Sequence, residues 1–175
     1  MKQEIKPMLA RTYAGQDVAG WMMQEKFDGI RAVWDGETLW TREGNRINAP
    51  AAWLARLPAD IALDGELWAG RGRFAVVESV RRRKCSTVED WAALSFVAFD
   101  APEHGGTAAE RIEFVESLGI ECADTWNCLG ESHARETMRM FVADGGEGIM
   151  LRDPSAPYVH GRSRFMLKMK PGEGF

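Results

Sequence analysis

The sequence predicts one α+β domain in which mostly antiparallel sheets are flanked by helices. Short apolar, β-prone segments recur along the chain, and amphipathic or capped segments typical of helices lie between them. No repeat, low-complexity tract or clear linker divides the 175 residues, so the whole chain, 1–175, is expected to form a single domain. Its 45% hydrophobic and 27% charged residues are typical of a globular protein with a substantial core.

Strands are expected at the β-prone runs 21–23, 30–34, 39–42, 61–68, 95–100, 147–152 and 164–170. Asp28-Gly29 separates the first two runs and is a turn pair typical of hairpins, so we expect a β-hairpin with Lys26 near its end. Gly65 interrupts the run 61–68, which indicates a bulge or the close approach of another backbone. The run 95–100 is apolar enough to predict a central strand.

Helices are expected at 49–57, 73–83, 107–118 and 132–143. In the first of these, Trp53, Leu54 and Leu57 fall on one face, as the apolar face of an amphipathic helix requires. Thr107 and Glu110 have the spacing of a capping box, in which a hydroxyl and a carboxylate satisfy backbone N–H groups at the start of a helix.

The composition excludes several classes of protein. The three cysteines are odd in number and form no C-x-x-C pair, which argues against a disulfide framework and against a structural zinc site. The N-terminus has no apolar segment of signal-peptide length, and no run is long enough to span a membrane. We therefore expect a cytoplasmic protein with no membrane partner, and a monomer.

Positive charge is concentrated in one stretch, although the net charge of the chain is −4. This stretch contains Arg71, Arg73, Arg81, Arg82, Arg83 and Lys84. A helix over 73–83 would carry a basic end able to contact the phosphates of a nucleic acid. The alternative is a solvated basic face with no partner.

Lys26 is the candidate nucleophile. It follows the apolar run 21–23, and burial disfavours the charged form of a lysine. A neutral amine can attack phosphorus, whereas an ammonium group cannot. Strand alternation also predicts that Lys168 and Lys170 share one face. An exposed hairpin turn without chemistry is the alternative for the segment around Lys26.

Six motifs carry a resemblance to a known family. They follow in the order Glu25-Lys26-Phe27-Asp28-Gly29-Ile30-Arg31, Thr41-Arg42-Glu43-Gly44-Asn45, Leu63-Asp64-Gly65-Glu66-Leu67-Trp68-Ala69-Gly70-Arg71-Gly72-Arg73-Phe74, Phe99-Asp100-Ala101-Pro102, Glu147-Gly148-Ile149-Met150-Leu151-Arg152 and Gly161-Arg162-Ser163 to Leu167-Lys168-Met169-Lys170-Pro171. The order and spacing resemble those of the covalent nucleotidyltransferases, which include DNA ligases, RNA ligases and mRNA capping enzymes. The resemblance is nearest to the minimal bacterial ATP-dependent DNA ligases and spans residues 6–171. It implies the ATP-grasp-like nucleotidyltransferase fold of their adenylation domain.

The resemblance implies a reaction in three steps. Lys26 attacks the α-phosphorus of ATP and holds AMP through a phosphoramidate, AMP passes to the 5′-phosphate of a nick, and the 3′-hydroxyl then displaces AMP and seals the strand. Lys168 and Lys170 would neutralise phosphate oxygens, and Asp28 would orient the attacking hydroxyl. DNA repair, replication and recombination are the processes that use such sealing.

The resemblance also implies which residues bind each partner. The residues expected at ATP or AMP are Gln24, Glu25, Lys26, Arg31, Arg42, Glu66, Phe99, Glu147, Lys168 and Lys170. Phe99 offers an aromatic face to adenine, and Glu66 and Glu147 are suited to hold Mg²⁺, for which Mn²⁺ can substitute. Glu66 is alternatively placed on the ribose hydroxyls. The residues expected at nicked duplex DNA are Arg42, Arg71, Arg73, Arg81, Arg82 and Arg83.

Ligases of this family carry an oligonucleotide-binding barrel (OB-fold) after the lysine-pair strand, and this sequence shows none. We expect that barrel, in cis or in trans, to be required for full activity. Two other functions stay open at this point. One is the same chemistry directed at RNA ends, because contacts to a 2′-hydroxyl are not visible in a sequence. The other is a nucleotide-binding module without turnover.

Overall fold

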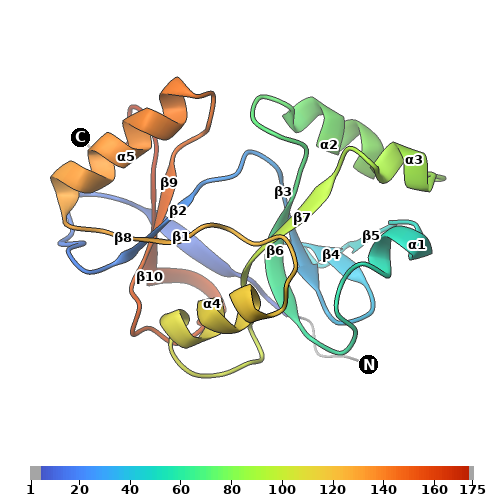
Figure 1. Cartoon of the computed structure of the whole chain (residues 1–175), viewed down its shortest axis with the longest axis horizontal. Coiled ribbons are helices and arrows are strands. Elements are labelled where there is room, and N and C mark those ends of the chain that lie inside the picture. The colour runs from blue at the N-terminus through green and yellow to red at the C-terminus, as the bar shows by residue number, and fades with distance from the viewer. Residues whose placement is uncertain (1–4, 174–175) are drawn as a thin grey trace.

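The computed structural model describes residues 5–173 and contains two five-stranded sheets that lie side by side (Figure 1). Sheet 1 has the order β1 (Met8–Thr12), β10 (Gly161–Met169), β9 (Ile149–Arg152), β2 (Met22–Glu25) and β8 (Trp126–Asn127). Sheet 2 has the order β5 (Arg46–Ile47), β4 (Leu39–Thr41), β3 (Ile30–Trp34), β6 (Leu63–Trp68) and β7 (Ser95–Asp100). Among these strands only β1 and β10 pair in parallel, so the mostly antiparallel α+β class is confirmed.

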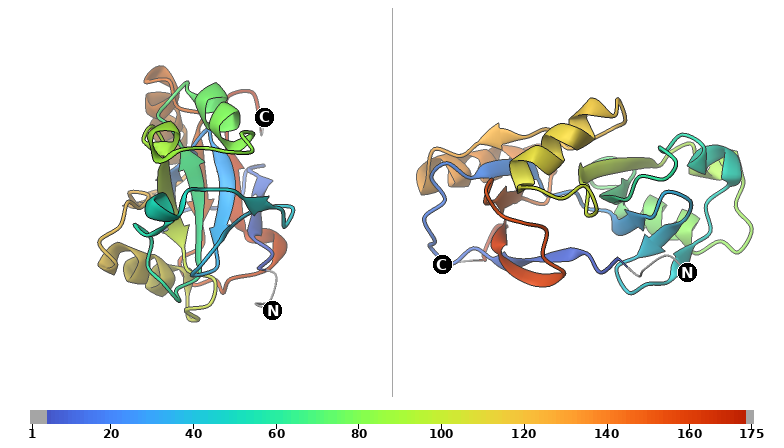
Figure 2. Two further views of the ribbon diagram at one scale, coloured as in Figure 1. Left: turned by 90° about the vertical axis from the view of Figure 1, so that its right-hand side faces the viewer. Right: turned by 90° about the horizontal axis from the view of Figure 1, so that it is seen from below.

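The helices cover the sheets and build a core on each. They are α1 (Ala51–Leu54), α2 (Phe74–Arg81), α3 (Val88–Trp91), α4 (Ala108–Ser117) and α5 (Glu131–Ala143). Helix α5 packs on sheet 1, and the other four pack against the core of sheet 2. Helix α4 lies below the junction of the two sheets (Figures 1 and 2). Within the described residues, no helix has the length and apolar character that crossing a membrane requires.

The segment around Lys26 is not a hairpin, so this prediction was wrong. Strand β2 pairs with β8 and β9 in sheet 1, whereas β3 pairs with β4 and β6 in sheet 2. The chain therefore crosses from one sheet to the other at Asp28-Gly29. At Gly29 it passes so close to β6 that a Cβ atom would lie 2.2 Å from the carbonyl oxygen of Leu67. The crossing places Lys26 between the two sheets.

Four other strands differ from expectation: the two-residue strands β5 and β8 had no prediction, and β7 and β1 differ as follows. β7 is an edge strand, not a central one, and it is buried because a later segment covers its edge. Ala98 donates its N–H to Glu121 O at 3.0 Å, and Ala123 donates to Ala98 O at 2.8 Å. Strand β1 had no prediction, because its apolar run is short and its partner β10 lies at the other end of the chain.

Several local predictions are confirmed. Thr107 caps α4 through a full capping box with Glu110. At Gly65 the register between β6 and β7 shifts, and a Cβ atom there would lie 2.6 Å from the ring of Phe96. The first helix is shorter than expected, but Trp53 is buried, and Leu54 and Leu57 pack against the same cluster.

Candidate active site

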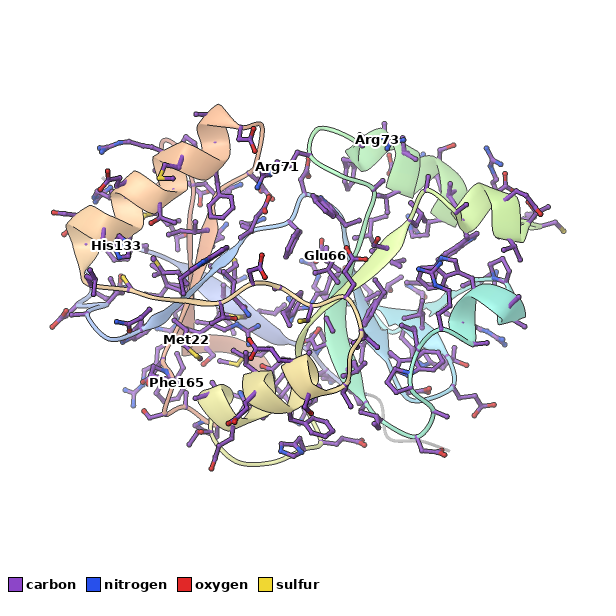
Figure 3. The ribbon with its side chains drawn as sticks, viewed as in Figure 1. Met22, Glu66, Arg71, Arg73, His133 and Phe165 are labelled. Carbon is purple, nitrogen blue, oxygen red and sulfur yellow. The ribbon has the colours of Figure 1, made fainter. Side chains whose placement is uncertain are left out.

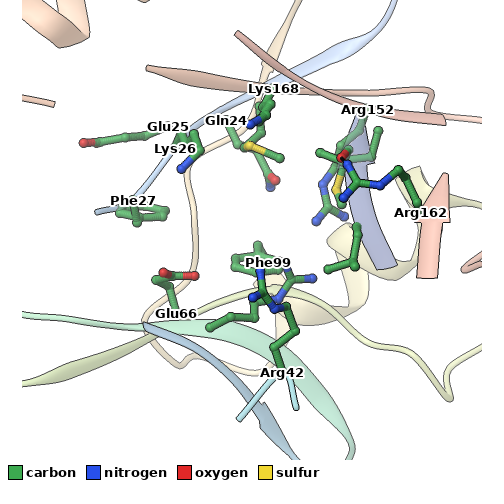
Figure 4. A pocket seen from close by; sticks show the side chains of 15 residues that line it. Gln24, Glu25, Lys26, Phe27, Arg42, Glu66, Phe99, Arg152, Arg162 and Lys168 are labelled. Atoms are coloured by element: carbon green, nitrogen blue, oxygen red, sulfur yellow. Dashed lines mark hydrogen bonds between the residues drawn. The ribbon is translucent and has the colours of Figure 1, made fainter. Parts of the chain in front are cut away.

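A cavity of about 280 Å³ opens where the two sheets face each other (Figure 4). Its lining consists of Leu9, Ala10, Gln24, Glu25, Lys26, Phe27, Arg31, Arg42, Glu66, Phe99, Met150, Arg152, Arg162, Met166 and Lys168. Six of these side chains are cationic and two are carboxylates. Such a lining favours a polyanionic ligand that also has an apolar part.

Both sheets supply side chains to this cavity. Lys26 follows the last residue of β2, and its N–H donates to Gly148 O at 2.9 Å, which fixes its backbone on sheet 1. Lys168 comes from β10 of the same sheet, while Glu66 and Phe99 come from β6 and β7 of sheet 2. A ligand in this cavity therefore contacts both halves of the domain.

The side chain of Lys26 forms an ion pair with Glu147. The other oxygen of Glu147 accepts a hydrogen bond from Lys170 Nζ at 3.2 Å, and this bond raises the pKa of Lys170. Lys168 and Lys170 both lie within 4 Å of the carboxylate of Glu173, at 3.5 and 3.7 Å, as expected for residues that share a face. Because an ion-paired ammonium is not a nucleophile, Lys26 must leave Glu147 and lose a proton before it can attack.

Glu66 is a carboxylate in a desolvated position. Burial raises its pKa to about 7, the carboxylates of Asp64 and Glu147 act in the same direction, and Arg31 and Lys26 oppose them. Within the described part of the chain, no hydrogen bond to this carboxylate is present. A desolvated carboxylate near a second one, Glu147, suits a divalent cation. The described residues contain no group of three or more His, Cys, Asp or Glu side chains arranged to hold a metal ion, so phosphate oxygens and water would have to complete the shell of a Mg²⁺ ion here.

The raised pKa of Glu66 predicts a pH-dependent cost in stability. An unfolded glutamate titrates near pH ~4.3, so as pH rises from there through 7 the unfolded chain loses a proton that the folded state still holds, and the free energy of unfolding falls. We expect Glu66→Gln to be more stable than the parent by about 3–4 kcal/mol above pH ~8, and by little below pH ~4. Urea unfolding across this range measures the difference. The exposed Glu113→Gln on α4 is the control, and an offset for Glu66→Gln that did not change with pH would contradict the prediction.

Arg31 is held by a buried network at the base of the cavity. Its Nε and Nη2 atoms each donate to Asp64 at 2.6 Å, and Nη2 also donates to Met8 O at 3.0 Å. Burial lowers the pKa of Arg31, but Asp64 outweighs this effect and raises it. Tyr158 donates its hydroxyl to Asp64 at 2.7 Å. The network therefore joins sheet 2 to β1 and to the segment before β10.

Phe99 and Gln24 are two of the residues expected at the nucleotide, and both line the cavity. The guanidinium carbon of Arg31 lies 4.6 Å from the centre of the Phe99 ring, and that of Arg152 lies 5.3 Å from it. Gln24 is 2% exposed, and its Nε2 donates to Thr125 Oγ1 at 3.0 Å. The side chain of Gln24 is thus oriented before a ligand arrives. Asp28 is not part of the cavity lining, so its expected role stays a prediction.

Glu25 differs from the other residues expected at the nucleotide. Figure 4 shows its carboxylate directed away from the cavity, and Arg71 holds it with two hydrogen bonds of 2.8 and 2.9 Å. Arg71 also pairs with Asp144, beside the end of α5 (Figure 3). The pairing with Arg71 therefore fixes the backbone next to Lys26 and keeps the carboxylate of Glu25 away from a ligand in the cavity.

The arginines expected at DNA have differing surroundings. Arg73 is exposed and precedes α2, and Arg81 is half-buried with an Nε atom that has no partner within the described residues. The others form ion pairs: Arg42 with Glu43, Arg82 with Glu78, and Arg83 with Asp90. A guanidinium carries five N–H donors, so Arg82 and Arg83, each with one nitrogen engaged, keep donors that could contact DNA.

Sequence reasoning missed several charged residues of the site. Arg152 and Arg162 line the cavity, and Asp64 and Asp100 are fully buried acids that hold arginines beside it. The sequence did offer one signal, which is a charged residue inside an apolar strand or at its end. Such a residue is expected to be buried with a partner, because burial of an unpaired charge is costly. The sequence alone does not identify that partner.

Comparisons with known proteins agree with this geometry. Residues 7–170 match the family described as ATP dependent DNA ligase domain. A DNA ligase of Haemophilus influenzae is 33% identical over 174 residues, which cover 95% of this chain and 64% of that protein. A DNA ligase of Methanothermobacter thermautotrophicus is 28% identical, with 95% of this chain and 36% of that protein covered.

Solved structures show the same fold. A structure from a study of Lig E DNA ligases, described as binding DNA with a minimal scaffold, has a TM-score of 0.86 and 34% identity and covers 94% of this chain and 68% of its own. The Chlorella virus DNA ligase–adenylate has a TM-score of 0.79 at 22% identity, with 96% and 68% of the two chains covered, and therefore bears on the fold alone.

Two facing sheets with a lysine-bearing, cation-rich cavity between them define a nucleotidyltransferase domain. The family match covers nearly all of the sequence. The chain belongs to the ATP-dependent DNA ligase domain family, and it corresponds to the adenylation domain of these ligases. It spans 64% of the length of the Haemophilus relative, which is less than two thirds.

Proposed function

We propose that this domain uses ATP to form a covalent lysyl-AMP at Lys26 and transfers the AMP to the 5′-phosphate of a nick in duplex DNA. The observation that carries the proposal is the position of Lys26, which projects between the two sheets into a cavity with six cationic side chains. A lysine placed among cations and beside an aromatic ring suits attack on a nucleoside triphosphate.

Each step of the proposed reaction forms and breaks one bond at phosphorus. The neutral amine of Lys26 attacks the α-phosphorus, an N–P bond forms, and the bond to pyrophosphate breaks. The 5′-phosphate of the nick then attacks the same phosphorus, which replaces the N–P bond with a P–O–P anhydride and returns the lysine. Finally the 3′-hydroxyl attacks the 5′-phosphorus, and AMP leaves as the phosphodiester forms.

The other side chains of the site act on charge and orientation. Lys168 and Arg162, both on β10, face the cavity and suit the phosphate oxygens, and Lys170 joins them from the end of the strand. Release of Glu147 from its two lysines would free Lys26 to attack. Phe99 offers a stacking surface of a kind worth about 1–3 kcal/mol per base.

A divalent cation is part of the proposal. Glu66 and Glu147 are the residues that would hold Mg²⁺, or Mn²⁺ in its place. When bound, the ion would neutralise charge on the phosphates during transfer. Its binding requires Glu66 in the ionised form, so occupancy should fall as pH drops below about 7.

The partners beyond ATP are also proposals. Nicked duplex DNA is the substrate, contacted by Arg42 and by the basic stretch from Arg71 to Arg83. An OB-fold domain, in cis or in trans, is expected to increase the rate of lysine adenylation. We further propose that the protein acts as a monomer in the cytoplasm, in repair, replication or recombination of DNA.

The experiment that tests the substrate compares sealing of nicked DNA and nicked RNA duplexes by one preparation with ATP and Mg²⁺. We expect sealing of the DNA nick and little sealing of the RNA nick. A pre-adenylated nick included beside each substrate separates the sealing step from adenylation of Lys26. Faster sealing of RNA would move the assignment to an RNA ligase, and adduct formation with no sealing of either substrate would contradict the ligase proposal.

A further inference from the structure

A buried cluster of three charged side chains lies directly beside the nucleotide cavity. It consists of Asp100 at the end of β7, Arg111 on α4 and Arg152 at the end of β9, which are 0%, 1% and 5% exposed. The cluster thus joins both sheets and a helix. Two guanidinium groups share one carboxylate, so a positive charge remains in a desolvated place, which is unfavourable without a compensating role or partner.

Arg111 is directed entirely into the protein. Its Nε donates to Asp100 Oδ1 at 2.7 Å and its Nη2 to Oδ2 at 3.4 Å. Its Nη1 donates to Gly106 O at 2.9 Å and to Ala156 O at 3.2 Å. Arg111 is not part of the cavity lining, so it can act on a ligand only through its neighbours.

Asp100 connects Arg111 to the cavity. Its Oδ2 accepts a hydrogen bond of 2.7 Å from Arg152 Nη1, and its Oδ1 accepts the N–H of Ala101 at 2.8 Å. Burial raises the pKa of Asp100, but Arg152 and Arg111 outweigh this effect and lower it. Asp100 directly follows Phe99 in β7, so the contacts of the Asp100 carboxylate also fix the backbone that carries the Phe99 ring.

Arg152 is the member of the cluster that faces the ligand. It lines the cavity, and its guanidinium carbon lies 5.3 Å from the centre of the Phe99 ring. Its Nε atom is buried and has no hydrogen-bond partner within the described residues. Within the described residues the guanidinium of Arg152 forms a side-chain hydrogen bond only to Asp100, so this carboxylate fixes the orientation of Arg152 beside the Phe99 ring.

We propose that Arg111 is a positioning residue for the nucleotide pocket, which holds Asp100 so that Arg152 and Phe99 keep the orientation that receives ATP. Without Arg111, Asp100 has one cationic partner, and Arg152 can turn onto both carboxylate oxygens and away from the ligand. The inference rests on the proposed function of the cavity, because it takes ATP as the ligand.

Arg111→Met removes the charge and keeps most of the side-chain length. We expect the KM for ATP in self-adenylation to rise about tenfold while kcat stays within about twofold, because the lost contact acts on the ground state and the transition state alike. Val115→Ala is the control, since Val115 is 1% exposed on the same helix and packs in the apolar core of sheet 2. It should lower stability and leave the KM unchanged.

A double-mutant cycle tests whether Arg111 acts through Arg152. The Arg111→Met/Arg152→Met protein should have the KM of Arg152→Met alone, because the second residue transmits the effect of the first. Effects that multiply, or a KM for Arg111→Met no higher than that of Val115→Ala, would overturn the proposal. If Arg111→Met does not fold, Arg111→Lys keeps the charge without the fork; a KM rise of about threefold supports the proposal, and no rise overturns it.

Equilibrium titration with ATP separates this inference from the proposed function. Arg111→Met should bind ATP about tenfold more weakly than the parent, whether or not an adduct forms. A parent protein that binds ATP and forms no adduct would contradict the proposed function alone. Equal affinity of parent and Arg111→Met, with adduct formation intact, would contradict the role of Arg111 alone.

Discussion

Lys26→Ala is expected to abolish the AMP adduct that ATP and Mg²⁺ leave on the denatured chain. A phosphoramidate survives unfolding, whereas nucleotide held by Phe99 and the cationic side chains is released when the cavity is lost. Of the other described lysines, Lys168 also lines the cavity, and Lys168 and Lys170 both lie within 4 Å of the carboxylate of Glu173. Gel electrophoresis with labelled ATP, or intact-protein mass spectrometry, measures the adduct.

Two controls make this result specific. Lys26→Arg keeps the positive charge that pairs with Glu147 but offers no suitable nucleophile, so it should also form no adduct. Lys6→Ala changes an exposed lysine outside the cavity lining and should form the adduct normally. An undiminished adduct on Lys26→Ala would place the nucleophile elsewhere and remove the basis of the proposed reaction.

Asp64→Asn is expected to destabilise the fold by about 3–5 kcal/mol, the typical cost of removing one partner of a buried ion pair. Asp64 is 0% exposed and accepts two hydrogen bonds of 2.6 Å from Arg31 and one of 2.7 Å from Tyr158. Asparagine removes the ionised group to which Arg31 is hydrogen-bonded and turns an amide donor toward the donors of Arg31 and Tyr158. Urea unfolding at neutral pH measures the loss.

The size of this effect distinguishes the buried network from surface ion pairs. Glu78→Gln breaks the pair between Glu78 on α2 and Arg82, the residue after α2, which are 35% and 69% exposed. This change should cost less than about 1 kcal/mol. Tyr158→Phe removes one hydrogen bond to Asp64 and should cost about 1–2 kcal/mol. A loss for Asp64→Asn as small as that for Glu78→Gln would show that Arg31 finds another partner.

Much of the site could be predicted from residue types in order. Lys26, Glu66, Phe99 and Lys168 were expected at one site, and the cavity brings all four together. Glu147 lies beside them, because it forms ion pairs with Lys26 and with Lys170. Their roles in the reaction stay predictions. Such residues are recognisable because nucleophiles, phosphate partners and metal ligands must be particular side chains.

The sequence by itself determined the local features of this protein. Apolar runs marked most of the strands, and Thr107 with Glu110 marked the start of α4, because alternation and capping depend on residues near each other in the chain. Gly65 likewise marked a close backbone approach, since a Cβ atom there would lie 2.7 Å from the carbonyl oxygen of Val97.

Only the tertiary structure decided which strands pair and which charges meet. Asp28-Gly29 has the composition of a hairpin turn, yet β2 and β3 join different sheets because their partners β9 and β6 lie far away in the sequence. Arg31 and Arg152 likewise gain Asp64 and Asp100 as partners only when both sheets assemble. Strand pairing and buried ion pairs are set by packing between segments that are distant in the sequence. Local sequence patterns do not encode which of these segments come into contact.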